Sequence, residues 1–599
     1  MGGNAEENAN HAETFPLKEK YLPQFFFPPQ NMNNPKSLSN MFCDKHHVNQ
    51  LTSLLHQHQI CDCVVCPGSR NAILIHNFKQ AGFQLYPVTD ERSAAFVALG
   101  ICLQRQSPVA ICVTSGSALL NTLPAVAEAS YRHLPLLVIS ADRPTEWIGQ
   151  LDGQTLPQEG ALTPYTETFH LSAAEDATAN WHNQLLINRA LLRVRQNGGQ
   201  PVHINIPIRE PLFSFQTAEL PVTWPIREEM GDTGHPLSDE TVHAIQSARL
   251  PIVFVGQYEK GTIPALRTIE ENNSLLVLPE IISGQVGSWR TTWLEQLLPH
   301  LDFRPDLVIH IGGNLVNKQL KLHIRKISAC SVIRIDETGQ VADTFQHLRI
   351  LVRATPQEAL SQLASILPPQ QEVQKWKTLL DQGLHLSEKY QPLHFSDIGI
   401  LQRLSQRIPK HAAIHLANSS PVRNASCFLG SFPGRIFCNR GVNGIEGSLS
   451  TATGYAMLHP HITLAVIGDL CFFYDLNALW NTRLPSGLRI LLFNNAGGQI
   501  FQNLPGLNQS PALRQFIAAA HTTTAQGVAQ TYGLEYHCAH SYDEVDRAIG
   551  CLLREDTDSP VLLEVFTDTA DNYEEGQLLK QYYLKQWTYE TRMETPQGI

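Results

Sequence analysis

The chain has 599 residues, of which 43% are hydrophobic and 17% are charged, a composition typical of a soluble globular protein and not of a disordered one. With 44 basic and 55 acidic side chains its formal charge is −11, and in the absence of a long basic run the sequence predicts no binding to nucleic acid or to an anionic membrane. At about 150 residues per domain, this length predicts three or four domains.

The twelve cysteines are scattered singly, apart from Cys61, Cys63 and Cys66. This cluster could be a metal or redox site, or a buried strand in which cysteine acts as a small apolar residue. The second interpretation is favoured because no further Cys or His pair supplies the missing ligands. Reduced thiols, no signal peptide and no apolar run of about 20 residues together predict a cytoplasmic protein without an integral membrane span.

Residues 1–37 are rich in Asn, Glu and Pro, and we expect a poorly ordered N-terminal extension. From residue 38 to 215, apolar runs of strand length alternate with helical patterns, which predicts a doubly wound parallel sheet. The expected strands are Asp62–Cys66, Gln84–Val88, Val109–Val113, Leu136–Ser140 and Pro201–Ile206, and the expected helices include Asn71–Gln80, Leu119–Ser130 and Asn180–Gln196.

Polar residues follow several of these strands. Ser69 and Arg70 come directly after the first strand, where backbone N–H groups and a guanidinium can hold an anion, although Ser69 also fits an ordinary helix N-cap. Glu91 opens a helix, and at that position a glutamate can simply interact with the helix dipole. The long polar loop Thr145–Glu159 is of the kind that often carries function.

A second α/β region is expected at residues 236–367, with the strands Pro251–Val255, Ser274–Leu278, Leu307–Ile311 and Ser331–Ile335. Gly312-Gly313-Asn314 follows one of them but lacks the full GxGxxG pattern, so a nucleotide site is not predicted there. A charged helical segment, residues 368–389, leads into a third region at residues 390–599. The predicted fold class is α/β, with three doubly wound parallel-sheet domains.

In the third region, the apolar run Leu464–Ile467 ends in Gly468-Asp469, and Leu488–Phe493 ends in Asn494-Asn495. Ligands of open α/β sheets bind at the carboxyl ends of the strands, and Mg²⁺ prefers the oxygen ligands that Asp and Asn offer. An ordinary βαβ unit with Asp and Asn as turn and cap residues remains an alternative.

The Gly-Asp and Asn-Asn pairs resemble the metal and diphosphate motif of thiamine diphosphate enzymes, except that Leu470 stands where the family usually has glycine. With the motifs at 66–70, 89–96, 114–118, 141–144, 439–447 and 494–501, residues from about 40 to 570 are similar to the 2-succinyl-5-enolpyruvyl-6-hydroxy-3-cyclohexene-1-carboxylate synthases of menaquinone biosynthesis. The resemblance implies a pyruvate decarboxylase-like architecture, with a pyrimidine-binding domain (38–215), a central structural domain (236–367) and a diphosphate-binding domain (390–599).

The resemblance also implies how the cofactor is held. Glu91 would be the catalytic carboxyl that hydrogen-bonds ring nitrogen N1′ of thiamine diphosphate, and the apolar residues 94–97 would give it a weakly hydrated wall. Asp469, Asn495 and the backbone carbonyl of Gly497 would bind Mg²⁺, or Mn²⁺ in its place. Ser419 and Ile445 would contact the cofactor.

The implied substrates are 2-oxoglutarate, which is decarboxylated, and isochorismate, which receives the succinyl carbanion equivalent. Both carry carboxylates, which arginine pairs with bidentately. The positions that resemble the substrate site are Ser69, Arg70, Arg143, Gln154, Lys318, Arg423 and Arg440, with Ser419 beside them. For any single arginine a surface salt bridge is an alternative role, and for Arg143 an internal ion pair is another.

Because Glu91 and Asp469 lie in different regions, and the family closes its site between two chains, a homodimer or a dimer of dimers is implied. Three rival functions stay open. Two belong to the same superfamily: an acetolactate synthase-like carboligase, which would bind FAD in the middle region, and a 2-oxoacid decarboxylase. The third is a non-catalytic relative that binds a metabolite.

Overall fold

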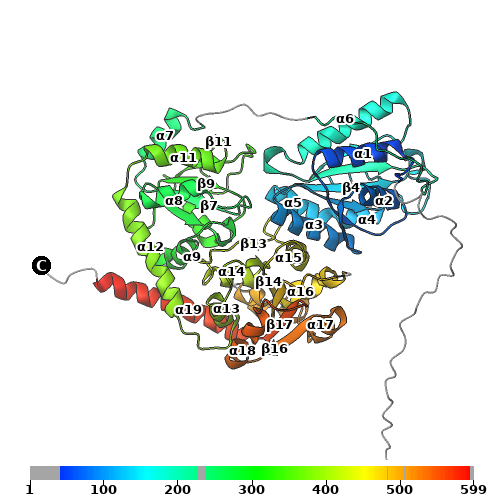
Figure 1. The fold of residues 1–599 in the computed structure, drawn as a ribbon. Helices are drawn as coiled ribbons and strands as arrows, with labels where there is room; N and C mark the ends of the chain where they lie inside the picture. The colour runs from blue at the N-terminus through cyan, green and yellow to red at the C-terminus, as the bar shows by residue number, and fades with distance from the viewer. Residues whose placement is uncertain (1–40, 227–235, 482, 505, 594–599) are drawn as a thin grey trace, which may run out of the picture.

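Three parallel β-sheets, each covered by helices on both faces, form the protein (Figure 1). This computed structural model describes residues 41–226, 236–481, 483–504 and 506–593. The predicted α/β class with three parallel sheets is confirmed. The predicted extension at residues 1–37 lies outside the described residues, and the predicted domain limits stay predictions.

The first sheet has the strand order β2-β1-β3-β4-β6-β5. Its strands are β1 Asp62–Val65, β2 Gln84–Pro87, β3 Val109–Val113, β4 Leu136–Asp142, β5 Glu167–His170 and β6 Val202–Pro207. Its helices are α1 His46–Gln57, α2 Ala72–Gln80, α3 Glu91–Arg105, α4 Ser117–Asn121, α5 Leu123–Arg132 and α6 Ala177–Arg193. The core on one face includes residues of α1, α2 and α6, and the core on the other face includes residues of α3 and α5.

Two features of this sheet differ from the prediction. The single helix expected at Leu119–Ser130 is wrong, because α4 ends at Asn121 and α5 begins at Leu123 with Pro124 in its first turn. Proline cannot donate the backbone hydrogen bond of a helix interior, so it fits only at the start of a new helix. The edge strand β5 was not predicted, since Phe169 is its only buried residue and its sequence contains no apolar run.

The middle sheet has the order β11-β10-β9-β7-β8. Its strands are β7 Pro251–Val255, β8 Leu276–Pro279, β9 Leu307–Ile311, β10 Ser331–Ile335 and β11 Leu348–Val352. Its helices are α7 Asp239–Gln246, α8 Pro264–Glu271, α9 Trp289–Leu297, α10 Lys318–Arg325 and α11 Pro356–Ile366. The helix α12, Gln371–Lys389, packs on α9 and leads to the third sheet (Figure 1).

The third sheet has the order β13-β12-β14-β15-β17-β16. Its strands are β12 Ala413–Leu416, β13 Ile436–Cys438, β14 Thr463–Gly468, β15 Leu488–Asn494, β16 Glu535–Ala539 and β17 Val561–Phe566. Its helices are α13 Asp397–Ser405, α14 Ser420–Ser426, α15 Ser448–Ala456, α16 Asp469–Tyr474, α17 Gln526–Tyr532, α18 Tyr542–Leu552 and α19 Thr569–Met593.

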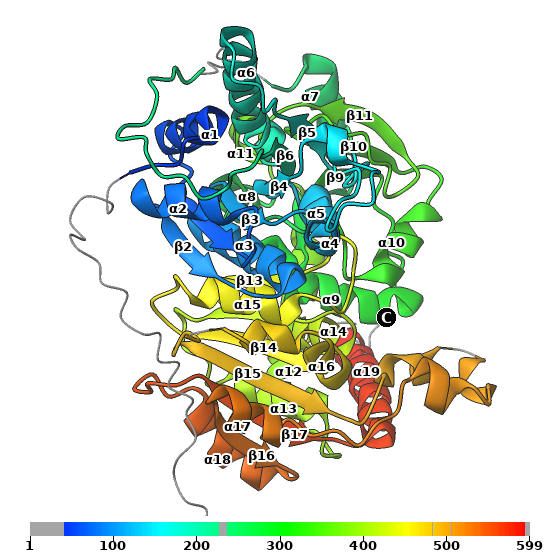
Figure 2. The same ribbon diagram turned by 90° about the vertical axis from the view of Figure 1, so that its right-hand side faces the viewer.

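Helices α3 and α15 pack closely and join the first sheet to the third (Figure 2). Glycines make this approach possible: a Cβ at Gly100 would lie 2.1 Å from the carbonyl oxygen of Thr451, and one at Gly454 would lie 2.1 Å from that of Val97. The apolar residues 94–97, predicted as a wall for Glu91, lie in this helix interface and are fully buried.

Within the described parts of the chain, no helix is both long and apolar enough to span a bilayer. Cys63 lies in the buried strand β1 and Cys66 directly after it, as the strand interpretation predicted. All twelve cysteines are free thiols, and the described residues contain no group of three His, Cys, Asp or Glu side chains placed to hold a metal ion.

Candidate active site

The ends of β14 and β15 bring Asp469, Asn495 and Gly497 together. The two strands pair in parallel with Gly468 opposite Phe493, so the residues that follow them emerge at the same edge of the sheet. Asp469 is buried, and its carboxylate accepts the backbone N–H of Leu470 at 2.6 Å and that of Gly497 at 2.9 Å. Burial raises the pKa of this carboxyl group.

Asn495 leaves an oxygen available beside this carboxylate. Its Nδ2 donates to Gln499 Oε1 at 2.9 Å, whereas its buried Oδ1 has no hydrogen-bond partner among the described residues. A buried polar atom without a partner requires an explanation. An amide oxygen next to a carboxylate is a donor set that suits Mg²⁺, so these residues fit the ion that the sequence predicts.

A second buried acid adds to this concentration of negative charge. Burial, together with the charge of nearby Asp469, raises the pKa of Asp397 to about 6. Asp397 accepts the Thr567 hydroxyl at 2.8 Å and lines the same cavity as Asp469. Two buried carboxyl groups at close range form an environment that a bound cation would stabilise.

The backbone conformation at Leu470 explains why glycine is not needed at this position. Residue 470 lies in the first turn of α16, and Gly468 before it has a φ of −87°. Neither residue adopts the left-handed conformation that favours glycine. The departure from the Gly-Asp-Gly pattern is therefore compatible with this backbone.

A cavity of about 130 Å³ opens over Asp469, and Ser419 and Ile445 form part of its wall. Ser419 is held at a φ of +76°, a conformation that costs a non-glycine residue free energy and that is often found at functional sites. Every residue that lines the cavity falls between 397 and 501. Its volume is below the roughly 300–1,000 Å³ of complete small-molecule sites.

Two predicted substrate-binding arginines lie next to this cavity. The buried Arg440 donates through Nη1 to Asn418 Oδ1 at 3.3 Å and through Nη2 to the Leu315 carbonyl at 3.1 Å. The exposed Arg423 donates to the carbonyl of Ser419, on the cavity wall, at 2.7 Å. Each guanidinium group is thus hydrogen-bonded to a residue that lines the cavity, Asn418 or Ser419.

Lysines of α10 extend this positive region. Lys318 is exposed and begins the helix, and Lys321 lies one turn further along. Burial lowers the pKa of Lys321, and the positive charges of Lys318 and Arg440 lower it further. The sequence prediction missed Lys321, because only the three-dimensional placement of α10 brings it near Arg440.

Glu91 is the first residue of α3 and is half-buried. Its Oε2 accepts Asn121 Nδ2 at 3.1 Å. Its two sequence neighbours point to the third sheet region instead: Asp90 accepts Asn477, and Arg92 donates to the Tyr474 carbonyl at 2.9 Å. Glu91 therefore faces α4, away from the contacts that its neighbours make.

Ser69, Arg70 and Arg143 lie at the carboxyl ends of β1 and β4. Ser69 is exposed, whereas Arg70 is buried and donates to the Ile208 carbonyl at 2.8 Å and to Glu210 at 3.3 Å. Arg143 lies 3.9 Å from the same carboxylate, not in an ion pair with its neighbour in the sequence. Two arginines share this one exposed glutamate, and the buried Asp142 carboxyl group also lies near Arg70.

Gln154 belongs to the long loop after β4. Its side chain is exposed and its φ is +56°, and a Cβ at Gly116 would lie 3.3 Å from its backbone. Gln158, which the sequence prediction missed, anchors the loop: it accepts Gly116 N–H at 2.7 Å and donates to Asn205 at 2.7 Å. Gln158 is almost completely buried, a property that the sequence pattern does not reveal.

The predicted site residues therefore form two separate groups within one chain. One group lies at or beside the cavity over Asp469: Ser419, Ile445, Asn495, Gly497, Arg423 and Arg440. Lys318 begins α10 three residues after Leu315, whose carbonyl accepts Arg440. The other lies at the first sheet: Ser69, Arg70, Glu91, Arg143 and Gln154, none of which lines that cavity.

Comparison with known proteins decides the family. Residues 46–163 match the family model of the thiamine pyrophosphate enzymes' N-terminal TPP binding domain. A 2-succinyl-5-enolpyruvyl-6-hydroxy-3-cyclohexene-1-carboxylate synthase of Phocaeicola vulgatus is 38% identical over 563 residues, which is 91% of this chain and 99% of the relative. The chain belongs to this synthase family.

Other synthases of the family show a similar relation. The one from Bacteroides thetaiotaomicron is 36% identical over 91% of this chain and 99% of its own length, and the one from Desulfotalea psychrophila is 34% identical over 88% and 98%. The resemblance inferred from the motifs is confirmed, and the chain is a thiamine diphosphate-dependent enzyme of the transferase type.

Proposed function

We propose that this member of the synthase family decarboxylates 2-oxoglutarate and adds the succinyl carbanion equivalent to isochorismate in menaquinone biosynthesis, at a site shared between two chains. The products are 2-succinyl-5-enolpyruvyl-6-hydroxy-3-cyclohexene-1-carboxylate and CO₂. The observation that carries the proposal is the position of Arg423, whose guanidinium is bonded to the wall of the cavity over Asp469.

Thiamine diphosphate, when bound, supplies the nucleophilic carbon and the electron sink that a 2-oxoacid needs to lose CO₂. Asp469, Asn495 and the Gly497 carbonyl would hold Mg²⁺, and Mn²⁺ could replace it. Ser419 and Ile445 would contact the cofactor. Glu91 would hold a hydrogen bond at ring nitrogen N1′ and keep a proton there.

The cations would bind and orient the substrates. Arg423, Arg440 and Lys318 present positive charge beside the cavity of the third sheet, and Arg70 and Arg143 present it at the first sheet, with Ser69 and Gln154 as polar neighbours. An isolated carboxylate is costly to take out of water, whereas a guanidinium pairs with it through two hydrogen bonds. A 2-oxodicarboxylate and a ring dicarboxylate fit this charge better than pyruvate does.

We propose a homodimer, or a dimer of two such dimers, in which Glu91 of one chain faces the cavity over Asp469 of the other. The support is that Glu91 lies apart from that cavity within its own chain, and that the cavity is small for a complete site. The free thiols support a location in the cytoplasm.

The direct test of the reaction mixes the protein with thiamine diphosphate, Mg²⁺, 2-oxoglutarate and isochorismate. We expect CO₂ release and isochorismate loss in equal amounts. Unchanged isochorismate together with turnover of pyruvate would show that the chain is a different carboligase, and a flavin spectrum in the purified protein would point to the acetolactate synthase-like type.

Replacing Arg423 by alanine should raise the KM for 2-oxoglutarate by about 10- to 100-fold, because one charge-assisted hydrogen bond is lost. Steady-state kinetics with each substrate varied in turn measures this effect. Arg407→Ala is the matched control, since Arg407 is an exposed arginine paired with Asp546 at 2.9 Å and its loss should change neither KM. Unchanged kinetics for both substrates in Arg423→Ala would remove Arg423 from the site.

A further inference from the structure

The loop Asn439–Gly447 connects β13 to α15 and carries Arg440 and Ile445. Side chains from all three sheet regions bind it. In the middle region, Asn314 Nδ2 donates to the carbonyls of Arg440 and Gly441 at 2.6 and 2.9 Å. In the third, Asn418 Nδ2 donates to the Asn439 and Gly444 carbonyls at 2.6 and 2.7 Å. The first region contributes Glu128.

Glu128 binds the backbone immediately after Arg440. It lies on α5 and is 1% exposed, and its Oε1 accepts the N–H of Gly441 at 2.9 Å while its Oε2 accepts that of Val442 at 2.8 Å. A Cβ at Gly441 would lie 2.9 Å from Glu128 Oε2. Glycine therefore permits the close approach, and a single carboxylate fixes two consecutive peptide groups.

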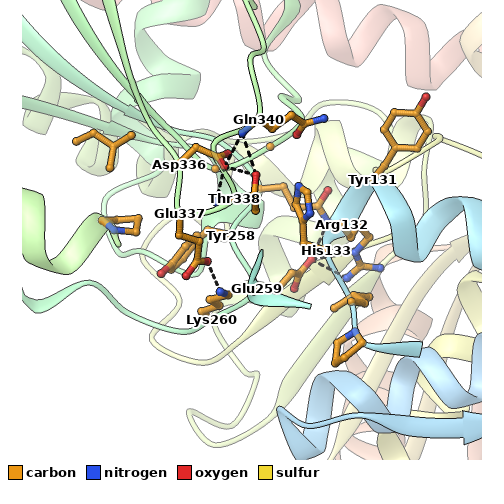
Figure 3. A pocket seen from close by; sticks show the side chains of 18 of the residues that line it. Tyr131, Arg132, His133, Tyr258, Glu259, Lys260, Asp336, Glu337, Thr338 and Gln340 are labelled. Carbon is orange, nitrogen blue, oxygen red and sulfur yellow. Dashed lines mark hydrogen bonds and ion pairs between the residues drawn. The ribbon is translucent and has the colours of Figure 1, made fainter. Parts of the chain in front are cut away.

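Arg132, one helical turn after Glu128, extends the contact to both ends of the loop. Its Nη1 lies 3.5 Å from Glu128 Oε1 and donates to Asn439 Oδ1 at 2.8 Å. Asn439 Nδ2 in turn donates to the Gly447 carbonyl at 3.2 Å. The other edge of the Arg132 guanidinium donates to Glu259 at 3.0 and 2.6 Å, in a cavity of about 450 Å³ between the first and middle sheets (Figure 3).

Arg440 depends on this backbone for its direction. Its guanidinium is held by Asn418 and by the Leu315 carbonyl, and its Nε is buried without a partner in the described part of the chain. A buried side chain with several fixed contacts moves when its own backbone moves, because packed interiors leave little room for independent adjustment. Catalytic geometry in turn tolerates little displacement.

We propose that Glu128 is a positioning residue for the reaction: its carboxylate fixes the peptide groups after Arg440 and so directs the Arg440 guanidinium to a substrate carboxylate. The proposal rests on the assignment of Arg440 to the substrate site in the proposed function. Glu128 itself does not line the cavity over Asp469, and it acts through the loop.

Glu128→Gln is the discriminating variant. Glutamine has nearly the same volume, but it offers one oxygen and places an NH₂ group against the second backbone N–H, so a donor faces a donor. We expect the KM of at least one substrate to rise by about tenfold, with kcat changed by less than about threefold. Gly441→Ala should raise the same KM, because its Cβ displaces the carboxylate from the loop side.

Asp306→Asn is the matched control. Asp306 also binds two consecutive backbone N–H groups, those of Arg249 at 2.7 Å and Leu250 at 2.8 Å, but it does so at the amino ends of β7 and β9. Its replacement should leave both KM values unchanged. An equal KM rise in Asp306→Asn would mean that Glu128 has a general structural role only, and would overturn the proposal.

A double-mutant cycle tests whether Glu128 acts through Arg440. If it does, Glu128→Gln should raise KM little further in an Arg440→Ala background, because residues that act as a unit are not additive. If the KM of the double variant rose by the product of the two single-variant increases, the proposal would be contradicted. A KM within about twofold of wild type in Glu128→Gln alone would also contradict it.

Hydrogen exchange supplies a measurement that does not need activity. The peptide that covers residues 439–447 should exchange faster in Glu128→Gln than in wild type, and should be unchanged in Asp306→Asn. An unchanged rate in Glu128→Gln would overturn the role of Glu128 even in an active enzyme. A faster rate in a protein that does not consume isochorismate would instead contradict the proposed function and leave the loop contact established.

Discussion

Replacing Glu91 by glutamine is expected to lower kcat by about 100- to 10,000-fold, the range that loss of a positioned acid or base group causes. An amide cannot share a proton with ring nitrogen N1′ in the way that a carboxyl group can. The fold should be unaffected, because Glu91 is half-buried and its hydrogen bond comes from Asn121 Nδ2. Single-turnover and steady-state rates measure the effect, and circular dichroism reports the fold.

Glu167→Gln is the matched control for this result. Glu167 is an exposed glutamate of the first sheet that pairs with Arg189 and Arg193 at 3.8 and 3.5 Å. The Glu167→Gln protein should have the kcat of the wild type, since surface ion pairs contribute little to the stability of the fold. A near-wild-type rate in Glu91→Gln would contradict the role given to Glu91.

Replacing Asp469 by alanine is expected to raise the Mg²⁺ concentration needed for half-maximal activity by at least about 100-fold. Loss of a residue that only supports a metal ligand already lowers metal affinity by about 10- to 100-fold, and loss of a ligand should cost at least as much. Thiamine diphosphate should bind correspondingly more weakly, because Asp469 would help to hold the Mg²⁺ that accompanies the cofactor's phosphate groups. Titration of activity with Mg²⁺ and calorimetric titration of the cofactor measure both effects.

Asp469→Ala should also be less stable, because it removes the acceptor of two backbone N–H groups, and each buried donor left unpaired costs about 1–3 kcal/mol. Asp469→Asn keeps an acceptor there and separates metal binding from stability. Asp475→Asn is the control: Asp475 is a buried carboxylate bonded to Ser450 N–H at 2.7 Å and does not line the cavity. An unchanged Mg²⁺ requirement in Asp469→Ala would exclude Asp469 as a ligand.

The parts of the fold that the sequence predicted are those whose physical cause is local. Central strands such as Val109–Val113 and Leu307–Ile311 are buried on both faces, so they appear as continuous apolar runs. The edge strands Glu167–His170 and Leu348–Val352, most of whose residues are only partly buried or exposed, were missed, whereas the edge strand Gln84–Pro87 was predicted.

In the candidate site, too, the residues placed by neighbouring strands were predicted, whereas contacts between distant segments were not. The metal-type ligands follow two strands that are neighbours in the sheet, and parallel pairing alone brings Asp469 and Asn495 to one edge. The hydrogen bonds of Glu128 to the loop Asn439–Gly447 and the electrostatic effect of Arg440 on Lys321 join distant parts of the chain. Side-chain periodicity contains no information on such pairs, because each residue fits its own helix equally well without its partner.

Mixing the Glu91→Gln and Asp469→Ala proteins, after dissociation and reassembly, tests most directly whether the site is shared between chains. In a two-fold dimer, each mixed pair contains one site with wild-type Glu91 and wild-type Asp469 and one site that lacks both. Random reassembly of equal amounts should then restore about one quarter of wild-type activity. Activity no greater than the sum of the two separate variants would show that each chain holds its own Glu91 and Asp469 in one site, and would contradict the shared site.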